Sequence, residues 1–403
     1  MKLTKLSELF LVSMIGLILA SLLTGCYLVT IDFVFVAASA GNTPGSNGQI
    51  YTYATDAESG ALRYGDPAVS SGGTNPVAMA VTSDYYNLYV ANAGNNSVVH
   101  FNVADTGVLT SKDTVTLADT PVALAVSPAN DYLFAISGTS SATLSEYSLS
   151  SGTIGNAAAT LQLTVPGYGS DIIIPTGVTV LANSNAVYVT AFDKSAYNPG
   201  GGTTSNANPG WIFGFSIGTN GALTPVSGSP YQAGVKPSAL ATDPTSRFVY
   251  VTDFASNELI GYTVLANDTL DFMVNGPFKT GNEPSAITID PRGIYIYIAN
   301  ELDNSVSAYS IALPTGTPST VVNPTAGNSN STDTEPVSII VDPSLGRFVY
   351  TANSVGDSVS GFRLNPNTGA ISTLQATPYP TGSNPMVVIA VPHGNHATQS
   401  VTP

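Results

Sequence analysis

The chain has 403 residues, 43% of them hydrophobic, and a formal net charge of −15 from 26 acidic and 11 basic side chains. Because phosphate binding needs clustered lysine and arginine, so acidic a chain argues against nucleic-acid binding. A single cysteine excludes both a disulfide within the chain and a metal site built from several cysteines.

The amino terminus has the pattern of a bacterial export signal. Lys2 and Lys5 precede an apolar stretch over residues 9–23, and the tetrad Leu23-Thr24-Gly25-Cys26 resembles a lipobox. We therefore predict a lipoprotein signal peptide over residues 1–25, lipid attachment to Cys26, and anchoring to the outer membrane or another exported face of the cell envelope. The alternative is an uncleaved anchor in which the cysteine is incidental.

Seven short segments, each opened by a proline that leads into an apolar strand, repeat along the rest of the chain. Successive prolines are 45, 54, 62, 47, 52 and 49 residues apart. A period of roughly 40–60 residues with four strand-sized runs indicates a β-propeller in which each repeat is one blade. The prolines are Pro76, Pro121, Pro175, Pro237, Pro284, Pro336 and Pro385.

A second strand, rich in β-branched and aromatic residues, lies inside six of these repeats. Such runs, bounded by glycine, proline, asparagine and aspartate, are typical of β-strands. They cover residues 88–92, 133–137, 187–191, 249–253, 296–300 and 349–353.

The two ends of the repeat array complement each other. Residues 34–38 form a second strand without a first strand before it, and residues 385–391 form a first strand without a blade after it. Pairing the two would leave no bare sheet edge. We therefore predict an all-β, seven-bladed propeller over residues 26–391, closed by the C-terminal strand and followed by a polar tail at 392–403. The alternative is another all-β array, such as a pair of sandwiches.

Two sets of loops are expected to open on one face of the ring, namely those before each first strand and those between second and third strands. Acidic and amide side chains gather in both sets, with Lys236 as the one cation, so we predict an acidic mouth. Many of these residues are equally expected as loop formers, as are the Asp-Pro turns of the opposite face. The predicted binding residues are Lys236, Asp253, Glu283, Asn300, Asp303, Glu335, Asn353 and Asp357.

One insertion interrupts the repeat pattern. Residues 194–210 separate the second and third strands of the fourth blade, so we expect them to hang over the mouth. Loops of this length are uncommon, and this one is predicted to be either a lid or a decoration without fixed structure.

The chain after Cys26 resembles the seven-bladed lactonase family, which includes bacterial 6-phosphogluconolactonases and fungal carboxymuconate cyclases. It also resembles the Tyr-Val-Thr-Asn propeller repeats of surface proteins. The run Asn300-Glu301-Leu302 matches an Asn-Glu-Leu segment of the lactonases, and this implies a catalytic role for Glu301. The chain departs from that family where Ser285 and Ala286 replace arginine and histidine, and where Ser238 replaces a histidine. A phosphorylated substrate needs such cations.

The three histidines are expected away from the mouth. His100 is predicted in the third strand of the second blade, and His393 and His396 in the polar tail. The mouth is therefore expected to lack an imidazole that could activate water.

Three functions are open at this point. The first expectation is a lipid-anchored, monomeric, non-catalytic scaffold without a cofactor, whose mouth binds a small-molecule ligand or an envelope protein. The second is a lactone hydrolase, either 6-phosphogluconolactonase-like or metal-assisted, and the third is a structural surface repeat protein. A divalent cation such as calcium would take oxygen ligands, for which the candidates are Asp253, Glu283, Glu301 and Glu335.

Overall fold

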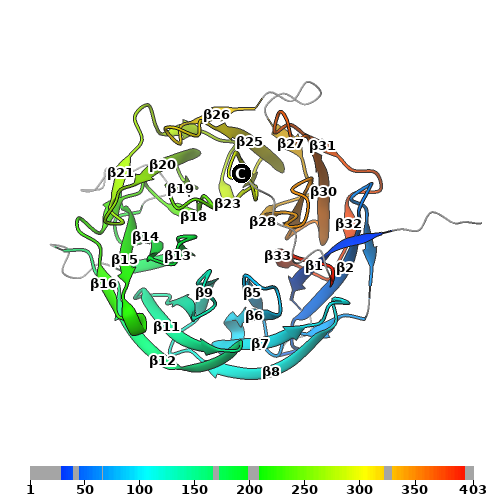
Figure 1. Cartoon of the computed structure of the whole chain (residues 1–403), viewed down its shortest axis with the longest axis horizontal. Coiled ribbons are helices and arrows are strands. Elements are labelled where there is room, and N and C mark those ends of the chain that lie inside the picture. Colours follow the sequence, from blue (N-terminus) through cyan, green and yellow to red (C-terminus); the bar gives the residue numbers. More distant parts are fainter. Residues whose placement is uncertain are drawn as a thin grey trace, which may run out of the picture.

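The structure, a computed structural model, describes residues 29–39, 45–65, 67–166, 172–197, 208–321 and 329–394. Within them seven antiparallel sheets surround a central axis, which confirms the predicted propeller (Figure 1). No helix in this part of the chain is long and apolar enough to cross a membrane. Residues 1–25, Cys26, His396 and most of the 194–210 insertion lie outside the described residues, so the predictions made for them stay predictions.

The innermost strand of each blade starts at the repeat proline, or two residues before it in blade four. In every blade the pairing with the second strand slips by one residue directly after the proline, so the next residue is a β-bulge. From blade one to blade seven these strands are β33 (Pro385–Pro392), β5 (Pro76–Val81), β9 (Pro121–Val126), β13 (Ile173–Val180), β18 (Pro237–Thr242), β23 (Pro284–Ile289) and β28 (Pro336–Val341).

The second and third strands form the buried middle of each blade. The second strands are β1 (Thr30–Ala38), β6 (Asn87–Asn92), β10 (Tyr132–Ser137), β14 (Ala186–Asp193), β19 (Phe248–Asp253), β24 (Tyr295–Asn300) and β29 (Phe348–Asn353). The third strands are β2 (Gln49–Asp56), β7 (Ser97–Val103), β11 (Thr143–Ser150), β15 (Gly210–Ile217), β20 (Glu258–Val264), β25 (Ser305–Ile311) and β30 (Ser358–Leu364).

The outer edge is one long strand in blades two and three, β8 (Leu109–Thr116) and β12 (Thr153–Gln162). In the other blades two short strands share it: β3 (Leu62–Tyr64) and β4 (Val69–Ser70), β16 (Leu223–Pro225) and β17 (Tyr231–Gln232), β21 (Leu270–Phe272) and β22 (Phe278–Lys279), β26 (Pro318–Thr320) and β27 (Ser329–Ser331), and β31 (Ile371–Thr373) and β32 (Tyr379–Pro380). Two single-turn 3₁₀ helices, η1 (Ala93–Asn95) and η2 (Thr219–Gly221), lie in loops.

The ring closes within blade one, as predicted. Strand β33 pairs antiparallel with β1, with Val391 opposite Phe33 and Val387 opposite Ala37. Figure 1 shows this last, red strand beside the first, blue one. Blade one is thus built from both ends of the array, and the edge of β1 is covered.

The hydrophobic core is divided into seven layers, each between two neighbouring blades. Seven clusters of buried side chains account for it, and each draws on two successive blades. A middle strand is therefore buried on both faces, as β24 is along its whole length. This explains why the second strands are continuous apolar runs in the sequence rather than alternating ones.

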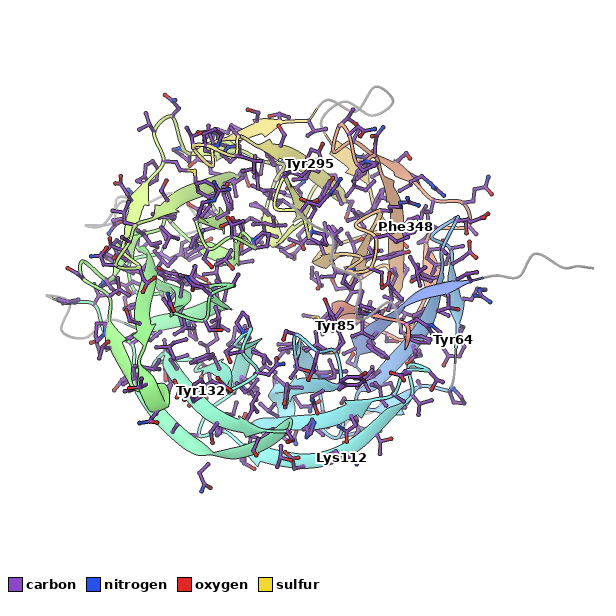
Figure 2. The ribbon with its side chains drawn as sticks, viewed as in Figure 1. Tyr64, Tyr85, Lys112, Tyr132, Tyr295 and Phe348 are labelled. Atoms are coloured by element: carbon purple, nitrogen blue, oxygen red, sulfur yellow. The ribbon has the colours of Figure 1, made fainter. Side chains whose placement is uncertain are left out.

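A tyrosine hydroxyl links most blades to the next. In the middle of the second strand the hydroxyl donates a hydrogen bond to a backbone carbonyl in the turn after the third strand of the following blade. The acceptor residue has a positive φ at every one of these turns and is a glycine in all but blade five, where it is Asp268. A Cβ built on Gly369 would lie 2.3 Å from the Tyr295 ring (Tyr295 is labelled in Figure 2). The bonds are Tyr89 to Gly152 (2.6 Å), Tyr188 to Asp268 (2.5 Å), Tyr250 to Gly316 (2.6 Å), Tyr297 to Gly369 (2.8 Å) and Tyr350 to Gly60 (2.7 Å).

Replacing Tyr297 by phenylalanine is expected to lower the free energy of unfolding by about 1–2 kcal/mol, because the buried Gly369 carbonyl loses its partner. Urea denaturation of the purified chain measures the change. Tyr86→Phe is the matched control, since Tyr86 is 51% exposed. Equal midpoints for the two variants would show that the hydroxyl does not hold the blades together.

Blade three breaks this pattern. Phe134 stands where five other blades have tyrosine, as Phe35 does in blade one, and Glu146 lies directly opposite Phe134 on β11. The Glu146 side chain is fully buried beneath the Gly221 turn of blade four, and neither carboxylate oxygen has a hydrogen-bond partner within the described residues. Burial raises the pKa of Glu146 to about 7.

Blade two places a histidine at the equivalent position. His100 lies opposite Tyr89 in β7, the third strand of the blade, as predicted. It is buried, with Nδ1 2.8 Å from Asp113 and Nε2 2.9 Å from Asn87. Both ring nitrogens are therefore engaged by the blade itself.

The Asp-Pro turns of the face opposite the repeat prolines are structural, as predicted. Asp243, Asp290 and Asp342 are buried, and their carboxylates accept backbone N–H bonds from the first residues of the following strand. Arg247, Arg292 and Arg347 lie in the same turns, so three of the five arginines belong to this face.

Candidate functional site

The two predicted sets of loops share one face of the ring. In six blades the repeat proline pairs with the last residue of the second strand, as Pro284 does with Asn300 and Pro336 with Asn353, and in blade four it pairs two residues before that end. The loop before the innermost strand and the loop after the second strand therefore leave the blade at the same end. We call this end the mouth.

The residue before the proline has a left-handed backbone in four blades. Its φ is 54° at Asn75, 54° at Glu283, 56° at Glu335 and 53° at Asn384. This conformation is uncommon for glutamate, and such outliers are often found at functional sites. The positions of Glu283 and Glu335 are thus set by the loop rather than by local backbone preference.

The preceding blade fixes these positions. The N–H of Glu283 donates to Asn257 Oδ1 (2.8 Å), that of Glu335 to Asn304 Oδ1 (2.7 Å), and that of Asn384 to Asp357 Oδ1 (2.7 Å). The carbonyl of Glu283 in turn accepts the N–H of Glu301 at 2.9 Å. The loops thus hold both glutamates through the backbone, and the Glu335 carboxylate in addition accepts a long bond from Ser354 Oγ (3.4 Å).

Several of the predicted binding residues hold the loops together. Asp253, Asn300 and Asn353 are fully buried. Asp253 accepts N–H bonds from Val235 and Lys236, and the amides of Asn300 and Asn353 donate to serine hydroxyls of the third strand. Their role in binding a ligand stays a prediction.

Asp303 and Asp357 are exposed on the rim. Asp303 accepts bonds from the Asn282 backbone N–H (2.7 Å) and amide (2.8 Å), while Asp357 bonds to Asn384. Both carboxylates tie a loop to the start of an innermost strand. Like the buried residues, they are engaged by the protein itself.

Four charged side chains remain and act on one another. Glu301 is half-buried, and burial together with the negative charges of Glu335 and Glu283 raises its pKa. The Lys236 ammonium partly opposes that rise. The structure thus gathers Glu301, Glu283, Glu335 and Lys236 from blades five, six and seven, around the glutamate of the Asn-Glu-Leu run.

Lys236 is held by aromatic rings that sequence reasoning did not single out. Its ammonium lies 4.2 Å from the ring centre of Phe254, 5.4 Å from that of Tyr197 and 5.9 Å from that of Phe192. Cation–π contacts of this kind fix an ammonium in place. Tyr197 belongs to the described start of the insertion, so that segment does reach the mouth.

The charge of the mouth differs from the prediction in one respect. Lys194 follows β14, lies on the same face and is exposed, so Lys236 is not the single cation there. His393 lies at the other end of its blade, where its N–H donates to Ile31 at the start of β1. His100 and His393 are therefore both away from the mouth.

The candidate cation ligands do not form a metal site. No three His, Cys, Asp or Glu side chains in the described part of the chain come close enough to hold a metal ion. Both Asp253 oxygens accept backbone N–H bonds, from Val235 and Lys236, so this carboxylate has a structural role in the loop. Binding of a divalent cation such as calcium therefore stays a prediction.

A narrow cavity of about 280 Å³ lies below the mouth, within the central opening visible in Figure 2. All seven innermost strands line it with residues that directly follow the repeat prolines. Ser285 is the first residue of blade six in this wall and follows Glu283 by two residues. Glu301 lies nearby, because it follows the residue that pairs with Pro284. The cavity therefore begins close to the charged cluster along the chain, but none of the four charged residues lines it.

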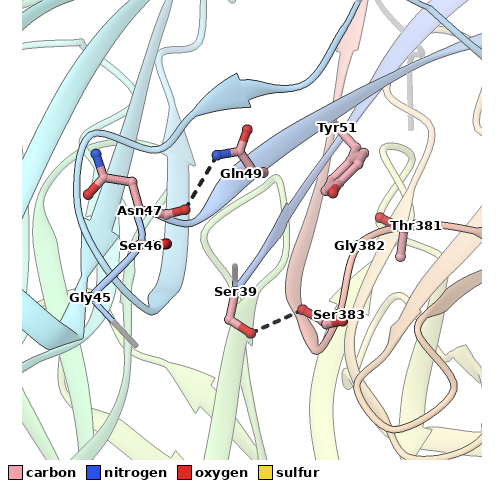
Figure 3. A pocket seen from close by; sticks show the side chains of 9 residues that line it. All are labelled: Ser39, Gly45, Ser46, Asn47, Gln49, Tyr51, Thr381, Gly382 and Ser383. Carbon is pink, nitrogen blue, oxygen red and sulfur yellow. Dashed lines mark hydrogen bonds between the residues drawn. The ribbon is translucent and has the colours of Figure 1, made fainter. Parts of the chain in front are cut away.

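A larger pocket of about 730 Å³ lies on the mouth face of blade one (Figure 3). Its described lining carries hydroxyl and amide groups, and Ser39 Oγ donates to the Ser383 carbonyl at 3.1 Å. None of these lining residues is a carboxylate, lysine, arginine or histidine, so the pocket carries no side chain that is charged near neutral pH. The chemistry of this face is concentrated around Glu301.

Comparison with known proteins identifies a family. The family model described as lactonase, 7-bladed beta-propeller matches residues 47–170 and 215–389. No curated protein sequence matches the chain significantly.

Solved structures show the same fold at low sequence identity. A periplasmic gluconolactonase from Pseudomonas aeruginosa superposes with a TM-score of 0.73 at 16% identity, covering 90% of this chain and 99% of that one. A candidate 6-phosphogluconolactonase from Bacteroides uniformis gives 0.71 at 17% identity, covering 90% and 100%. A protein from Lactobacillus plantarum gives 0.70 at 16% identity, covering 90% and 99%.

Proposed function

Because the chain belongs to the seven-bladed β-propeller lactonase family, we propose that it hydrolyses a lactone at the mouth of the ring. The observation that carries this proposal is the half-buried Glu301, whose pKa is raised by burial and by two neighbouring glutamates. A raised pKa makes the carboxylate a better proton acceptor near neutral pH. Family membership and this cluster favour the lactonase alternative over the non-catalytic scaffold expected first from the sequence.

The proposed reaction assigns a role to each charged residue. The Glu301 carboxylate takes a proton from water as the water oxygen attacks the lactone carbonyl carbon. Lys236, held in place by its aromatic neighbours, stabilises the negative charge that develops on the carbonyl oxygen. The ring C–O bond then breaks, and its oxygen takes the proton from Glu301 to give a hydroxy acid.

The charge of the site favours a substrate without phosphate. Glu283 and Glu335 flank Glu301, and the wall positions Ser238, Ser285 and Ala286 carry no cation. A phosphate would meet three carboxylates and one ammonium, and a dianion needs more donors than that. The name of the Pseudomonas aeruginosa relative, a gluconolactonase, agrees with an unphosphorylated lactone.

We further propose that the protein is exported. The basic and apolar amino terminus and the periplasmic location named for the Pseudomonas aeruginosa relative support this. Lipid attachment at Cys26 and anchoring to the envelope remain part of the proposal, and a Cys26→Ser variant that stays in the membrane pellet would contradict them.

The pH dependence of hydrolysis tests the proposed base. We expect kcat/KM to rise with pH as Glu301 loses its proton, with an apparent pKa above the ordinary value of 4.5. Glu335→Gln removes a neighbouring negative charge, so the same limb should move to lower pH. The measurement is kcat/KM for glucono-δ-lactone and δ-valerolactone across the acidic range.

The control for this profile is Glu58→Gln, the same chemical change at an exposed residue of blade one. It should leave the profile where it is. A limb that stays unmoved in Glu335→Gln, or moves to higher pH, would exclude Glu301 as the titrating base. Failure of the protein to hydrolyse any unphosphorylated lactone would overturn the proposed function itself.

A further inference from the structure

The seam between blades seven and one is built differently from the seams between the other blades. From blade two to blade seven, the turn after each innermost strand contacts the turn of the next blade, as Gly346 of blade seven contacts Pro291 of blade six. Blade one has no such turn, because its strands β33 and β1 come from opposite ends of the array. The turn of blade seven therefore packs against the start of β1, where Ser344 meets Asp32.

Two buried carboxyl groups meet at this seam. Asp32 of β1 and Asp342 of the blade-seven turn are both fully buried, and their side chains are hydrogen-bonding neighbours. Ser344 Oγ lies 2.5 Å from Asp32 Oδ1 and 3.2 Å from the Ile31 carbonyl oxygen, so it ties the same turn to β1. Two carboxylates in contact in a buried site do not both ionise, because like charges there repel strongly.

The hydrogen bonds around the pair indicate which of the two acids carries the proton. Asp342 accepts four backbone N–H bonds, and such bonds favour the ionised form. Their donors are Leu345, Gly346, Arg347 and Phe348, at 2.5–3.2 Å. Asp32 accepts only the Ser344 hydroxyl, on Oδ1, while its Oδ2 has no donor within the described residues. An O–H on Asp32 Oδ2 that donates to Asp342 gives this otherwise unpaired atom its partner.

No cation at the seam compensates a second negative charge. In the described part of the chain, no lysine, arginine or histidine side chain forms an ion pair with either aspartate. Arg347 and His393 reach the seam through backbone N–H groups. The groups that face Asp32 are Thr55 of β2, Pro392 of β33, Tyr85, Tyr350 and Asp342. Both tyrosines have a raised pKa and are neutral near pH 7, so Asp342 is the one group in this set that brings a charge.

We propose that Asp32 holds a proton in the folded chain and donates it to Asp342, so that a hydrogen bond between two acids fastens the closed ring and is lost as the pH rises. Burial, together with the charge of Asp342, raises the pKa of Asp32 well above its ordinary value of 3.8. Folding therefore favours the protonated form. This contribution to stability is complete below the ordinary value and is lost as the pH rises through the pKa of the folded chain. The closure of the ring is thus pH-sensitive and strongest in acidic surroundings.

The test compares the wild type with Asp32→Asn by urea denaturation between about pH 4 and about pH 8. The asparagine amide donates an N–H to Asp342 in place of the acid O–H and cannot lose it. The unfolding equilibrium constant of the wild type should therefore rise relative to that of the variant by up to about tenfold per pH unit, until Asp32 ionises in the folded chain. Glu146 titrates in both proteins and cancels. The control is Asp105→Asn, the same change at an exposed turn residue, which should follow the wild type.

A ratio of the two unfolding constants that does not change with pH would overturn the proposal, because Asp32 would then be ionised in the folded chain. If Asp32→Asn does not fold, hydrogen exchange of the wild type, read by mass spectrometry, decides instead. After correction for intrinsic rates, the amides of β33 should lose protection as the pH rises, while those of β19 in blade five keep theirs. Protection of β33 that is no more sensitive to pH than that of β19 would likewise overturn it.

Discussion

Replacing Glu301 by glutamine is expected to lower kcat/KM for lactone hydrolysis by about 10²–10⁴-fold. The amide has nearly the shape of the carboxylate but cannot accept the proton of the attacking water. The loop should stay intact, because it is held by backbone bonds such as that from the Glu301 N–H to the Glu283 carbonyl, which the substitution does not touch. Initial rates on the high-pH plateau of the wild-type profile give the comparison, because the carboxylate is ionised there.

The Glu58→Gln variant carries the same chemical change away from the mouth and should retain the wild-type rate. An equal melting temperature for Glu301→Gln and the wild type would show that a loss of rate is not a loss of folded protein. Activity within about threefold of the wild type in Glu301→Gln would remove this residue from the mechanism, since general-base catalysis contributes far more than that.

The free energy of unfolding of Glu146→Gln is expected to increase relative to that of the wild type when the pH is raised. Between about pH 5 and about pH 8 the difference between the two proteins should change by about 3 kcal/mol in favour of the variant. The pKa of Glu146 is about 7 in the folded chain against an ordinary value of 4.5, so folding favours the protonated form. That contribution is complete at low pH and is lost as the pH rises through the folded pKa. The glutamine amide of the variant is neutral at every pH, so the variant does not lose this stability as the pH rises.

Urea denaturation of both proteins at the two pH values measures the effect. Other buried carboxyl groups, such as Asp32 and Asp342, titrate in both proteins and cancel in the difference. Glu58→Gln should show no such pH-dependent difference. A constant stability gap between Glu146→Gln and the wild type at both pH values would mean that Glu146 is ionised or solvated at the interface of blades three and four.

The sequence was sufficient to predict the ring, because the same physical requirement recurs in each blade. Every innermost strand begins near a proline, where a missing N–H is tolerated next to a bulge, as at Pro284. Every second strand is buried on both faces and so appears as an unbroken apolar run. The pairing of β33 with β1 followed from two strands that each lacked a partner. The short outer strands, such as β22 (Phe278–Lys279), carry no comparable pattern and were not predicted.

The sequence was sufficient to predict which face of the ring carries the mouth, but not which of its residues could act on a substrate. Connectivity alone puts Asp253, Glu283 and Glu301 on one face. Whether a carboxylate is hydrogen-bonded within the protein depends on backbone N–H groups of other segments, as when Asp253 accepts the N–H of Lys236. The composition of the loops does not show which carboxylates are bonded in this way. The aromatic contacts of Lys236 come from Phe192 and Tyr197, about forty residues earlier in the chain, and only the folded ring brings them together.

Because β33 lies at the C-terminal end of the propeller, its pairing with β1 can form only after the other blades have been synthesised. Translation delivers the amino-terminal segments first. Until residues 385–392 have left the ribosome, the edge of β1 has no neighbour, so the nascent chain is an open arc. A chain that has not been synthesised beyond residue 385 therefore cannot form the closed ring.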